Sequence, residues 1–577
     1  MRTVLVANRG EIAVRVVRAA AERGWRSVAV YADQDADSLA VRLADSAVAL
    51  PGVTAAETYL DVTALLGAAR AAGADLVHPG YGFLSENAEF ARAVEAAGLV
   101  WIGPRPETIE TLGDKVAARS LARSVGAPLA PGSSRPLRDA AEAEAFADAH
   151  GLPVVVKAAH GGGGRGMRVA RTREEVAEAF AAATSEARAA FGRGECFVER
   201  FLENPRHLEV QVLGDGEGRV VVVGDRDCSL QRRNQKLVEE APAPAVDPEL
   251  RRTLHAAARA VTEAVRYRSA GTVEFLLGSD GTLSFCEVNT RLQVEHPVTE
   301  LTTGVDLVQE QFRIAEGRGL SFTTTPEPRG HAVEFRVNAE DPGRGFLPGP
   351  GRVTVLDVPG GPGVRWDAGV SAGDVVPAAF DSLLGKLVVH ADDRDAALRR
   401  ARRALAEFRV DGVPTVLPFA RAVVDDPAFS TEGFAVHTRW IENELMPRME
   451  PQRRPDLVVD PALQRFPIEI DGRRAVLGLP AALLSALGTA SGSEAGSEET
   501  GSVPADAGEL RARTPGTLTR WLVPDGAEVG ARQAVAVVEA MKMETRVPAH
   551  RAGVLRHVSA EGATLRAGQL VARVDEP

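Results

Sequence analysis

The chain of 577 residues is far longer than one hydrophobic core usually spans, so several domains are expected, each with a core of its own. Its hydrophobic fraction (45%) and charged fraction (25%) are ordinary for globular proteins, and no apolar run approaches the about eighteen residues of a membrane span. A net charge of −12 argues against nucleic acid as a partner, because binding to phosphates needs a basic surface.

The amino-terminal residues enter a strand-like apolar run at once, without the features of a secretory leader, which predicts a cytoplasmic location. The three cysteines, Cys196, Cys228 and Cys286, are widely spaced and include no CxxC pair. We therefore expect thiols in the core, with neither a disulfide framework nor a zinc site.

The first elements predict a βαβ unit, with a strand at 3–7, an amphipathic helix at 11–21 and a second strand at 27–31. The turn after the first strand, residues 7–11, contains a single glycine. A dinucleotide site needs GxGxxG there, so the pattern disfavours NAD and assigns this Rossmann-like opening the role of a scaffold.

A run of glycines at 161–164 lies between two strand-like segments, 154–157 and 169–170. A P-loop would end in Gly-Lys-[Ser/Thr] and open a helix, and neither feature is present. A mobile hairpin that covers phosphates fits the pattern, although a plain flexible loop would contain the same glycines. Lys157, shortly before the run, favours the phosphate interpretation.

Polar and apolar residues alternate between positions 287 and 295. In an extended chain the polar residues would share one face, because side chains alternate with a period of two. These residues are Glu287, Asn289, Arg291, Gln293 and Glu295. A solvent-facing edge strand would have the same pattern. Because the opposite face is apolar and Glu274 lies on a nearby strand-like segment, we favour a metal and substrate site.

Residues 488–508 are mostly glycine, serine, alanine and glutamate, which have little to bury and predict a disordered linker. Such a linker has a typical end-to-end distance of roughly 25 Å and a maximal reach of about 70 Å. The short segment before it, 446–487, contains one hairpin signal at 470–473. We expect this segment to dock a partner or to connect domains.

The residues after the linker contain an internal repeat, in which 525–535 resembles 561–571. Both copies read as turn, strand, turn, strand. Two similar halves of this size predict a small all-β barrel with pseudo-twofold symmetry at 509–577. Lys542 would lie in the exposed turn at its midpoint.

Lysine is scarce in this chain, because nearly every other basic residue is arginine. The five lysines are Lys115, Lys157, Lys236, Lys386 and Lys542. Arginine serves most exposed positive positions equally well, whereas lysine offers a compact and potentially nucleophilic amine. All five are therefore candidate functional residues. Lys386, inside a strand-like segment, is the one for which a function is least expected.

Residues 540–543, Ala-Met-Lys-Met, match the attachment motif of biotinyl carrier domains, and the carboxy-terminal segment of about seventy residues resembles that family. A solvated turn lysine between two core methionines is the alternative. The resemblance implies covalent biotin on Lys542.

Residues 1 to about 445 resemble biotin carboxylase. The resemblance lies in the motifs at 8–13 (NRGEIA), 78–87 (HPGYGFLSEN), 289–300 (NTRLQVEHPVTE) and 380–382 (FDS), together with the glycine run. It implies an α/β ATP-grasp fold, followed by the linker and a lipoyl-like biotinyl barrel. The domains expected are a Rossmann-like domain at 1–114, an ATP-grasp domain at 115–330 with its lid at 130–200, and a carboxy-terminal domain at 331–445.

The resemblance also implies a role for individual residues. ATP would be bound by Lys115, Lys157, Gly162, Gly163, Gly164, Glu199, Leu202, His207 and Gln231. Magnesium, or manganese in its place, would be held by Glu274, Glu287 and Asn289. Bicarbonate and biotin would be bound by Lys236, Arg291, Gln293, Val294, Tyr81 and Arg15. Glu295 would be the general base, and Arg336 would stabilise charge on the ureido oxygen of biotin.

The whole chain thus resembles the alpha subunit of a biotin-dependent acyl-CoA carboxylase, which carboxylates biotin with ATP and bicarbonate through carboxyphosphate. No segment is long enough for a carboxyltransferase, so a separate beta subunit is expected. A biotin protein ligase and a homo-oligomer within a larger complex are the other expected partners, and no membrane is expected. Acetyl-CoA or propionyl-CoA is the default acceptor. The alternatives are another acceptor such as pyruvate, a different ATP-grasp ligase, and a carrier or scaffold without activity.

Overall fold

The computed structural model describes residues 1–158, 167–191, 193–431, 433–450, 463–470, 473–480, 508–512, 516–540, 543–565 and 568–575. The chain divides into two compact units. The first comprises Met1–Val410 and Pro414–Gln452, and the second comprises Asp411–Val413 and Arg453–Pro577. The division of the first unit into three domains stays a prediction.

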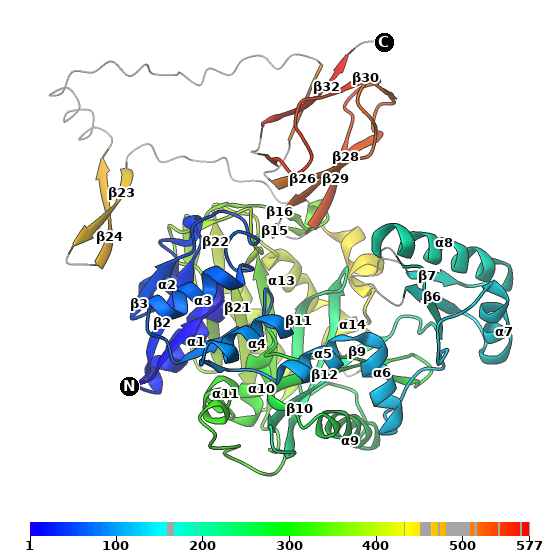
Figure 1. Ribbon diagram of the computed structural model, residues 1–577, viewed down its shortest axis with the longest axis horizontal. Helices are drawn as coiled ribbons and strands as arrows, with labels where there is room; N and C mark the ends of the chain where they lie inside the picture. The colour runs from blue at the N-terminus through cyan, green and yellow to red at the C-terminus, as the bar shows by residue number, and fades with distance from the viewer. Residues whose placement is uncertain are drawn as a thin grey trace. The chain divides into compact units, whose positions relative to one another are not determined.

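The amino-terminal part of the first unit is a parallel five-stranded sheet of order β3-β2-β1-β4-β5 (Figure 1). Its strands are β1 (Thr3–Val6), β2 (Arg26–Tyr31), β3 (Ser46–Ala49), β4 (Leu76–His78) and β5 (Val100–Trp101). The helices are α1 (Gly10–Glu22), α2 (Leu39–Leu43), α3 (Val62–Ala71), α4 (Ala88–Ala96) and α5 (Pro106–Gly113). All of β1 is buried, as is typical of a parallel strand covered on both faces. The predicted βαβ opening is confirmed.

A small three-stranded antiparallel sheet follows, with the order β7-β6-β8. It consists of β6 (Val154–Ala158), β7 (Met167–Ala170) and β8 (Cys196–Arg200), with the helices α7 (Ala140–His150) and α8 (Arg173–Phe191) packed in the same core. The helix α6 (Lys115–Ser124) packs in the core of the large sheet described next. The small sheet has its own core, in which Val154 and Val156 pack with Val176 of α8 and Val198 of β8. The two strands that flank the glycine run pair as a hairpin. Gly162, Gly163 and Gly164 lie outside the described residues.

The largest element is an antiparallel eight-stranded sheet of order β13-β12-β9-β10-β11-β14-β21-β19. Its strands are β9 (Arg206–Asp215), β10 (Val220–Arg232), β11 (Gln235–Ala241), β12 (Arg268–Leu277), β13 (Leu283–Asn289), β14 (His331–Asn338), β19 (Val364–Ala368) and β21 (Leu383–Ala391). Because β11 pairs directly with β14, the sheet continues across the domain boundary predicted at 330/331.

Further elements surround the large sheet. The helices are α9 (Pro248–Ala264), α10 (His296–Thr303), α11 (Leu307–Ala315), α12 (Arg394–Glu407), α13 (Leu417–Asp425) and α14 (Pro427–Ser430). Short paired strands are β15 (Glu340–Asp341) with β16 (Leu347–Pro348), β17 (Gly351–Arg352) with β20 (Val375–Val376), and β18 (Val355–Asp357) with β22 (Arg409–Asp411).

The two faces of the large sheet differ in chemistry. On β9, Leu208, Val210 and Val212 belong to an apolar core that also contains residues of α9 and β12. The intervening residues Glu209 and Gln211 are also fully buried. Side chains alternate along a strand, so one face is apolar and the other carries buried polar groups. The polar face is the candidate site.

The second unit contains the hairpin of β23 (Leu463–Ile470) and β24 (Arg473–Pro480), in which Ile470 pairs with Arg473. This confirms the hairpin predicted from the turn signal, whose own two residues, 471 and 472, lie outside the described residues.

The remainder of the second unit is all-β, with two four-stranded sheets of order β25-β32-β30-β27 and β29-β28-β26-β31. The strands are β25 (Glu509–Arg511), β26 (Gly516–Trp521), β27 (Glu528–Val529), β28 (Ala534–Ala540), β29 (Met543–Pro548), β30 (Gly553–His557), β31 (Thr564–Leu565) and β32 (Leu570–Asp575). The first repeat leads through β27 into β28, and the second through β31 into β32. Each repeat places one strand in each sheet, which confirms the predicted pseudo-symmetric barrel. Lys542 lies in sequence between β28 and β29, outside the described residues.

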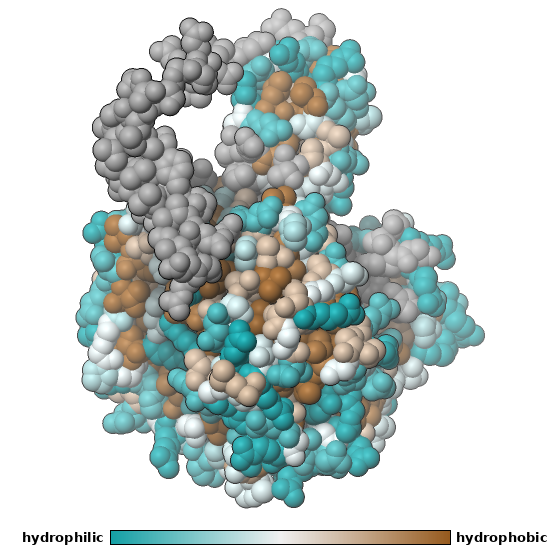
Figure 2. Space-filling model, turned by 60° about the vertical axis from the view of Figure 1, so that its left-hand side comes forward, coloured by the Kyte–Doolittle hydropathy of each residue, from teal (hydrophilic) through white to brown (hydrophobic). Residues whose placement is uncertain are grey.

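Hydrophobic residues also occur on the surface of the described residues. Figure 2 shows hydrophobic residues in patches among hydrophilic ones on the visible face. Large apolar side chains that are exposed include Leu43, Val53 and Leu60, and scattered exposures of this kind are normal. Among the described residues, no helix is long and apolar enough to cross a bilayer.

The cysteines only partly follow the prediction of core thiols. Cys196 and Cys228 are buried, but Cys286 is exposed. Cys286 lies on β13, an edge strand of the large sheet, and the buried Phe285 next to it points to the opposite face of that strand. The linker predicted at 488–508 lies outside the described residues, except for Gly508.

Candidate active site

The centre of the polar face is the ammonium group of Lys236 on β11. Its Nζ lies 2.5 Å from Glu209 Oε2, 2.9 Å from Glu274 Oε1 and 2.7 Å from Glu295 Oε1. Burial alone would lower the pKa of Lys236, but the three carboxylates outweigh burial and raise this pKa well above its ordinary value. Lys236 is therefore a fixed cation that holds three acidic side chains together.

A second fixed cation, Arg226 on β10, lies entirely out of contact with solvent. Its Nε donates to Glu209 Oε1 at 2.5 Å, and Nη1 donates to Gln211 and Thr299 at 2.9 and 2.8 Å. Nη2 donates to Thr272 at 3.2 Å. A buried guanidinium is stabilised when it is paired and hydrogen-bonded in this way. Arg226 therefore fixes the geometry of Glu209 and, through it, of Lys236.

Glu295 is fully buried and receives a cation on each oxygen. Lys236 contacts Oε1, and Arg336 Nη2 contacts Oε2 at 2.9 Å, while Arg336 Nε donates to Glu239 Oε1 at 2.6 Å. Burial would raise the pKa of Glu295, but Lys236, Arg336 and Arg226 outweigh it and hold this pKa well below its ordinary value. Glu295 is thus an ionised carboxylate in a dry environment, as a general base requires.

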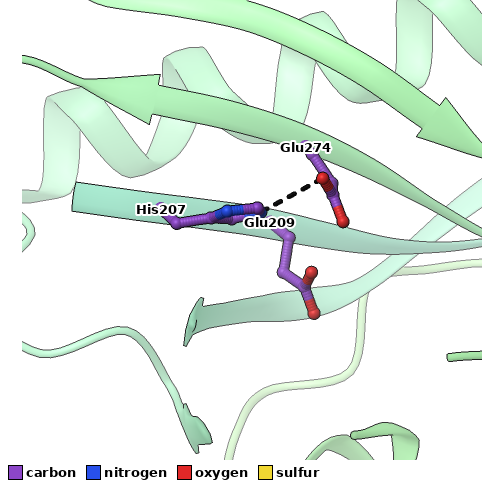
Figure 3. A group of neighbouring side chains, drawn as sticks. All are labelled: His207, Glu209 and Glu274. Carbon is purple, nitrogen blue, oxygen red and sulfur yellow. Dashed lines mark ion pairs between the residues drawn. The ribbon is translucent and has the colours of Figure 1, made fainter. Parts of the chain in front are cut away.

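Two groups of side chains in the described residues have metal-like spacing. They are His207, Glu209 and Glu274, and Glu209, Cys228 and Glu295. Figure 3 shows the first group, in which a dashed line joins His207 on β9 to Glu274 on β12, while the side chain of Glu209, also on β9, extends downward in the view. Lys236 already forms an ion pair with each carboxylate of both groups. Burial lowers the pKa of His207, but Glu274, whose Oε2 lies 3.2 Å from Nε2, outweighs burial and raises it. Neither group is therefore a ready-made metal site.

The metal ligands predicted from the sequence lie together on two paired strands. Glu274 on β12 is directly opposite Glu287 on β13, and Asn289 Nδ2 donates to Glu274 Oε1 at 2.8 Å. Glu287 Oε2 lies 3.5 Å from the ammonium of Lys115. These are carboxylate and amide oxygens, the donor set that magnesium prefers. The residues present therefore fit a magnesium ion.

The residues predicted to bind bicarbonate lie close together, but not on the extended strand that the alternation of polar and apolar residues predicted. We expected an extended strand from 287 to 295, whereas β13 ends at Asn289 and residues 290–295 turn away toward α10. The chain has to leave the sheet there because α10 begins at His296. Arg291 nevertheless donates to Gln293 Oε1 at 2.8 Å and to Asn289 Oδ1 at 2.9 Å.

The predicted nucleotide residues form two groups. Lys157 on β6 and Arg119 on α6 hold opposite oxygens of Glu199 on β8, at 2.8 and 3.0 Å. In the second group, His207 Nδ1 lies 3.4 Å from the side-chain amide of Gln231. Leu202, which follows β8 closely in sequence, is buried.

Tyr81 and Arg15, predicted to contact substrate, are both engaged elsewhere. The Tyr81 hydroxyl donates to Glu11 Oε1. Arg15 on α1 is buried and pairs with Glu300 and Asp306 at 2.9 and 2.7 Å. This side of α1 faces α10 and the start of α11, and the predicted substrate contact of Arg15 stays a prediction.

Several residues that hold the site together were not predicted from the sequence. They are Glu11, Glu86, Arg119, Glu209, Arg226 and Glu239. Glu209 could have been found from the polar positions that alternate in His-Leu-Glu-Val-Gln-Val at 207–212. Glu86 pairs with Arg291 at 2.8 Å across 205 residues of sequence, and no local pattern predicts such a pair.

Comparison with known proteins identifies this arrangement. Family descriptions match along the chain, as "Biotin carboxylase, N-terminal domain" at 1–109, "Carbamoyl-phosphate synthase L chain, ATP binding domain" at 114–323, "Biotin carboxylase C-terminal domain" at 334–443 and "Biotin-requiring enzyme" at 506–574. The biotin-dependent acyl-coenzyme A carboxylase alpha3 subunit of Mycobacterium leprae is 52% identical over 99% of this chain and 98% of its own length. The chain belongs to the family of biotin-dependent acyl-CoA carboxylase alpha subunits.

Relatives with the catalytic part alone show where that part ends. The biotin carboxylase of Haemophilus influenzae is 46% identical over 77% of this chain and 99% of its own length. The structure of biotin carboxylase from Campylobacter jejuni in complex with β,γ-ATP matches with a TM-score of 0.73 at 40% identity, over 77% of this chain and 99% of that one. A Hydrogenobacter thermophilus 2-oxoglutarate carboxylase domain in complex with MgADP, ADP and bicarbonate matches with a TM-score of 0.72 at 43% identity, over 77% and 98%. The first unit is therefore an ATP-grasp biotin carboxylase.

Proposed function

We propose that this chain uses ATP and bicarbonate to carboxylate biotin attached to Lys542, and supplies the carboxyl group to a separate carboxyltransferase subunit. The observation that carries this proposal is the ionised, fully buried Glu295 between Lys236 and Arg336. A base, a cation for an anionic substrate and a cation for a developing negative charge then lie within one cluster.

Glu295 is the general base in this proposal. Its carboxylate accepts the hydroxyl proton of bicarbonate, whose oxygen attacks the γ-phosphorus of ATP to give carboxyphosphate and ADP. Bicarbonate is itself an anion and competes for Lys236 and Arg291. When bicarbonate takes over the contact with Lys236, this cation no longer holds the pKa of Glu295 down. The base therefore becomes stronger as its substrate binds.

Magnesium, or manganese in its place, would be held by Glu274, Glu287 and Asn289, and would neutralise phosphate charge on the nucleotide. Lys115 and Lys157 are suited to neutralise the same phosphates, because each pairs with a glutamate that ATP phosphates can replace. The glycine run at 161–164 is part of this proposal on sequence grounds alone.

Biotin attached to Lys542 would supply the ureido nitrogen that accepts the carboxyl group. Carboxyphosphate would release CO2 for this step, and the phosphate left behind would take the proton of the nitrogen. Arg336 is suited to stabilise negative charge on the ureido oxygen, because its guanidinium is already fixed by Glu239 and Glu295. Tyr81, whose hydroxyl donates to Glu11, and Arg15 are proposed to contact bicarbonate or biotin. A biotin protein ligase would have to recognise the segment around Lys542.

Bicarbonate-dependent ATP cleavage by the purified full-length chain, with free biotin added, tests the catalytic part of the proposal. We expect cleavage that requires both bicarbonate and magnesium. A protein that binds ATP but shows no bicarbonate-dependent cleavage would reveal a scaffold and reject the proposal.

The carboxyltransferase is proposed to dock on the hairpin of β23 and β24. Its register places Phe466 opposite Leu477 and Ile468 opposite Ala475, so apolar residue types occupy alternate positions of both strands. An isolated two-stranded hairpin is marginally stable, and such a hairpin gains stability by packing on another surface. Replacing Phe466 and Ile468 with aspartate should abolish co-purification of the carboxyltransferase and leave ATP cleavage with free biotin unchanged.

The acceptor is proposed to be acetyl-CoA or propionyl-CoA. Similarity over the full length to an acyl-coenzyme A carboxylase subunit favours acyl-CoA. A pyruvate carboxylase subunit of Methanothermobacter thermautotrophicus, 45% identical over 76% of this chain, makes pyruvate the competitor. Carboxylation assays with the co-purified complex would decide between them. A homo-oligomer within that complex and a cytoplasmic location belong to the same proposal, and mass measurement of the complex and cell fractionation would test them.

A further inference from the structure

Lys386, the lysine for which a function is least expected from the sequence, is completely buried beside the catalytic turn. Its side chain has 0% exposure, and so it is a charged group without any solvent. Nζ donates to the backbone carbonyl of Val294 at 2.7 Å and lies 3.0 Å from Glu11 Oε1. Val294 immediately precedes Glu295, the general base of the proposed function.

Lys386 joins four parts of the fold that are distant in sequence. It lies on β21, directly opposite Arg336 on β14. Glu11 belongs to α1, and its Oε1 also accepts the hydroxyl of Tyr81 from the loop after β4. The carbonyl of Val294 belongs to the turn that leads into α10. A single ammonium group thus connects the amino-terminal domain, the loop that bears Tyr81 and the turn that bears the base.

The positive charge of Lys386 is compensated by neighbouring carboxylates. Burial would lower the pKa of Lys386, but Glu11 foremost, and Glu334 and Asp367 after it, outweigh burial and raise this pKa. Burying a matched lysine and glutamate gives no net gain over apolar residues of similar size. A pair of this kind adds little to stability, so a role in geometry better explains why the lysine is there.

We propose that Lys386 is a positioning residue for the general base, which fixes the turn at 294–295 through the Val294 carbonyl. The inference rests on the proposed role of Glu295. The turn is not part of the sheet, and the orientation of Glu295 therefore depends on contacts such as this one. Misplacing a catalytic group by about 1 Å lowers a rate by up to about 100-fold.

A purely structural role, in which Lys386 only neutralises Glu11, is the competing explanation. The two roles are separated by three variants, Lys386→Met, the double variant Lys386→Met/Glu11→Gln, and Lys386→Arg. Lys386→Met leaves Glu11 as an unpaired buried charge and should destabilise the protein. The double variant removes both charges, so it should regain most of the thermal stability. Lys386→Arg keeps the positive charge next to Glu11 but changes the position of the donor.

The measurement is bicarbonate-dependent ATP cleavage by the full-length chain with free biotin, alongside thermal unfolding. We expect the double variant to unfold near the wild-type temperature, with kcat about 10- to 100-fold lower and the KM for ATP within about twofold of wild type. Lys386→Arg should be folded and intermediate in kcat.

The positioning role would be overturned if the stable double variant had the kcat of wild type. If the double variant does not fold, a wild-type kcat in Lys386→Arg would overturn it. Wild-type protein and Glu295→Gln are the controls. If wild type itself shows no bicarbonate-dependent cleavage, the proposed function fails, and that result is distinct from an active wild type accompanied by equally active Lys386 variants.

Discussion

The catalytic sheet and the carrier barrel bury different kinds of side chain. One face of the eight-stranded sheet buries Glu209, Arg226, Lys236 and Glu295, whose charges compensate one another. The core of the barrel consists of apolar residues such as Leu518, Val535 and Leu555. Buried charges must be held in defined geometry, whereas apolar packing tolerates adjustment. The chemistry thus requires a fixed electrostatic arrangement, while the carrier needs only a stable small fold.

The largest expected effect comes from the carrier. Lys542→Arg should abolish biotin attachment, because a guanidinium is hard to acylate, and should abolish all carboxylation of the tethered cofactor. Intact mass measurement of protein from a ligase-competent host checks the attachment. Cleavage of ATP with free biotin should stay at the wild-type rate, since the catalytic sheet is unchanged. A loss of that activity too would show that the two units are not independent.

Removing the general base should leave biotin attached to Lys542 and should stop bicarbonate-dependent ATP cleavage. Glu295→Gln keeps the shape of the side chain but cannot accept a proton, so kcat should fall about 10²- to 10⁴-fold. Steady-state kinetics with free biotin provide the measurement, and intact mass should show normal biotinylation. A rate within a few-fold of wild type would mean that another group takes the bicarbonate proton.

The two kinds of core should respond differently to the loss of one residue. Arg226→Met leaves Glu209 with one cation fewer and should destabilise the first unit by about 3–5 kcal/mol. Adding Glu209→Gln should recover part of that loss, because the uncompensated charge disappears. For the barrel, Leu518→Ala should cost about 2–5 kcal/mol, with no charge partner able to restore it. Denaturant unfolding, followed by probes in each unit, tests whether recovery occurs in the sheet alone.

The smallest expected effect is a pH dependence of stability. Burial raises the pKa of Glu239 to about 7, in spite of the neighbouring guanidinium of Arg336. The folded protein therefore keeps a proton that the unfolded chain releases near its ordinary value of about 4.5. The contribution of Glu239 to the free energy of unfolding is fully present below pH 4.5 and is lost as the pH rises toward 7. Glu239→Gln should flatten the change in unfolding free energy between pH 5 and 7, and an unchanged slope would assign the titration to another group.

Sequence patterns predicted the parts of the molecule that depend on local order. The βαβ opening, the hairpin at 470–473 and the pseudo-symmetric barrel follow from hydrophobic period and turn residues, and all three are confirmed. Family motifs indicated Glu295 and Arg336, and the scarcity of lysine drew attention to Lys236.

The other features of the candidate site could not be predicted, because they depend on contacts between segments that are distant in sequence. Glu11 and Lys386 are separated by 375 residues and meet only in the folded chain. The alternation of polar residues predicted a strand and missed the turn after Asn289. The side chains of this turn converge through hydrogen bonds and not through strand alternation. Arg15 was assigned to the substrate site by resemblance, and its pairing with Glu300 and Asp306 is not visible in any local pattern.

The direct pairing of β11 with β14 has a mechanical consequence. Residues 238–241 of β11 pair with residues 332–335 of β14, so Lys236 and Arg336 lie on adjacent strands of one continuous sheet with no hinge between them. The small sheet of β6, β7 and β8 shares no strand with the large sheet and has a core of its own. A shift of the small sheet would therefore move Lys157 on β6 without changing the spacing of Lys236 and Arg336 on the large sheet.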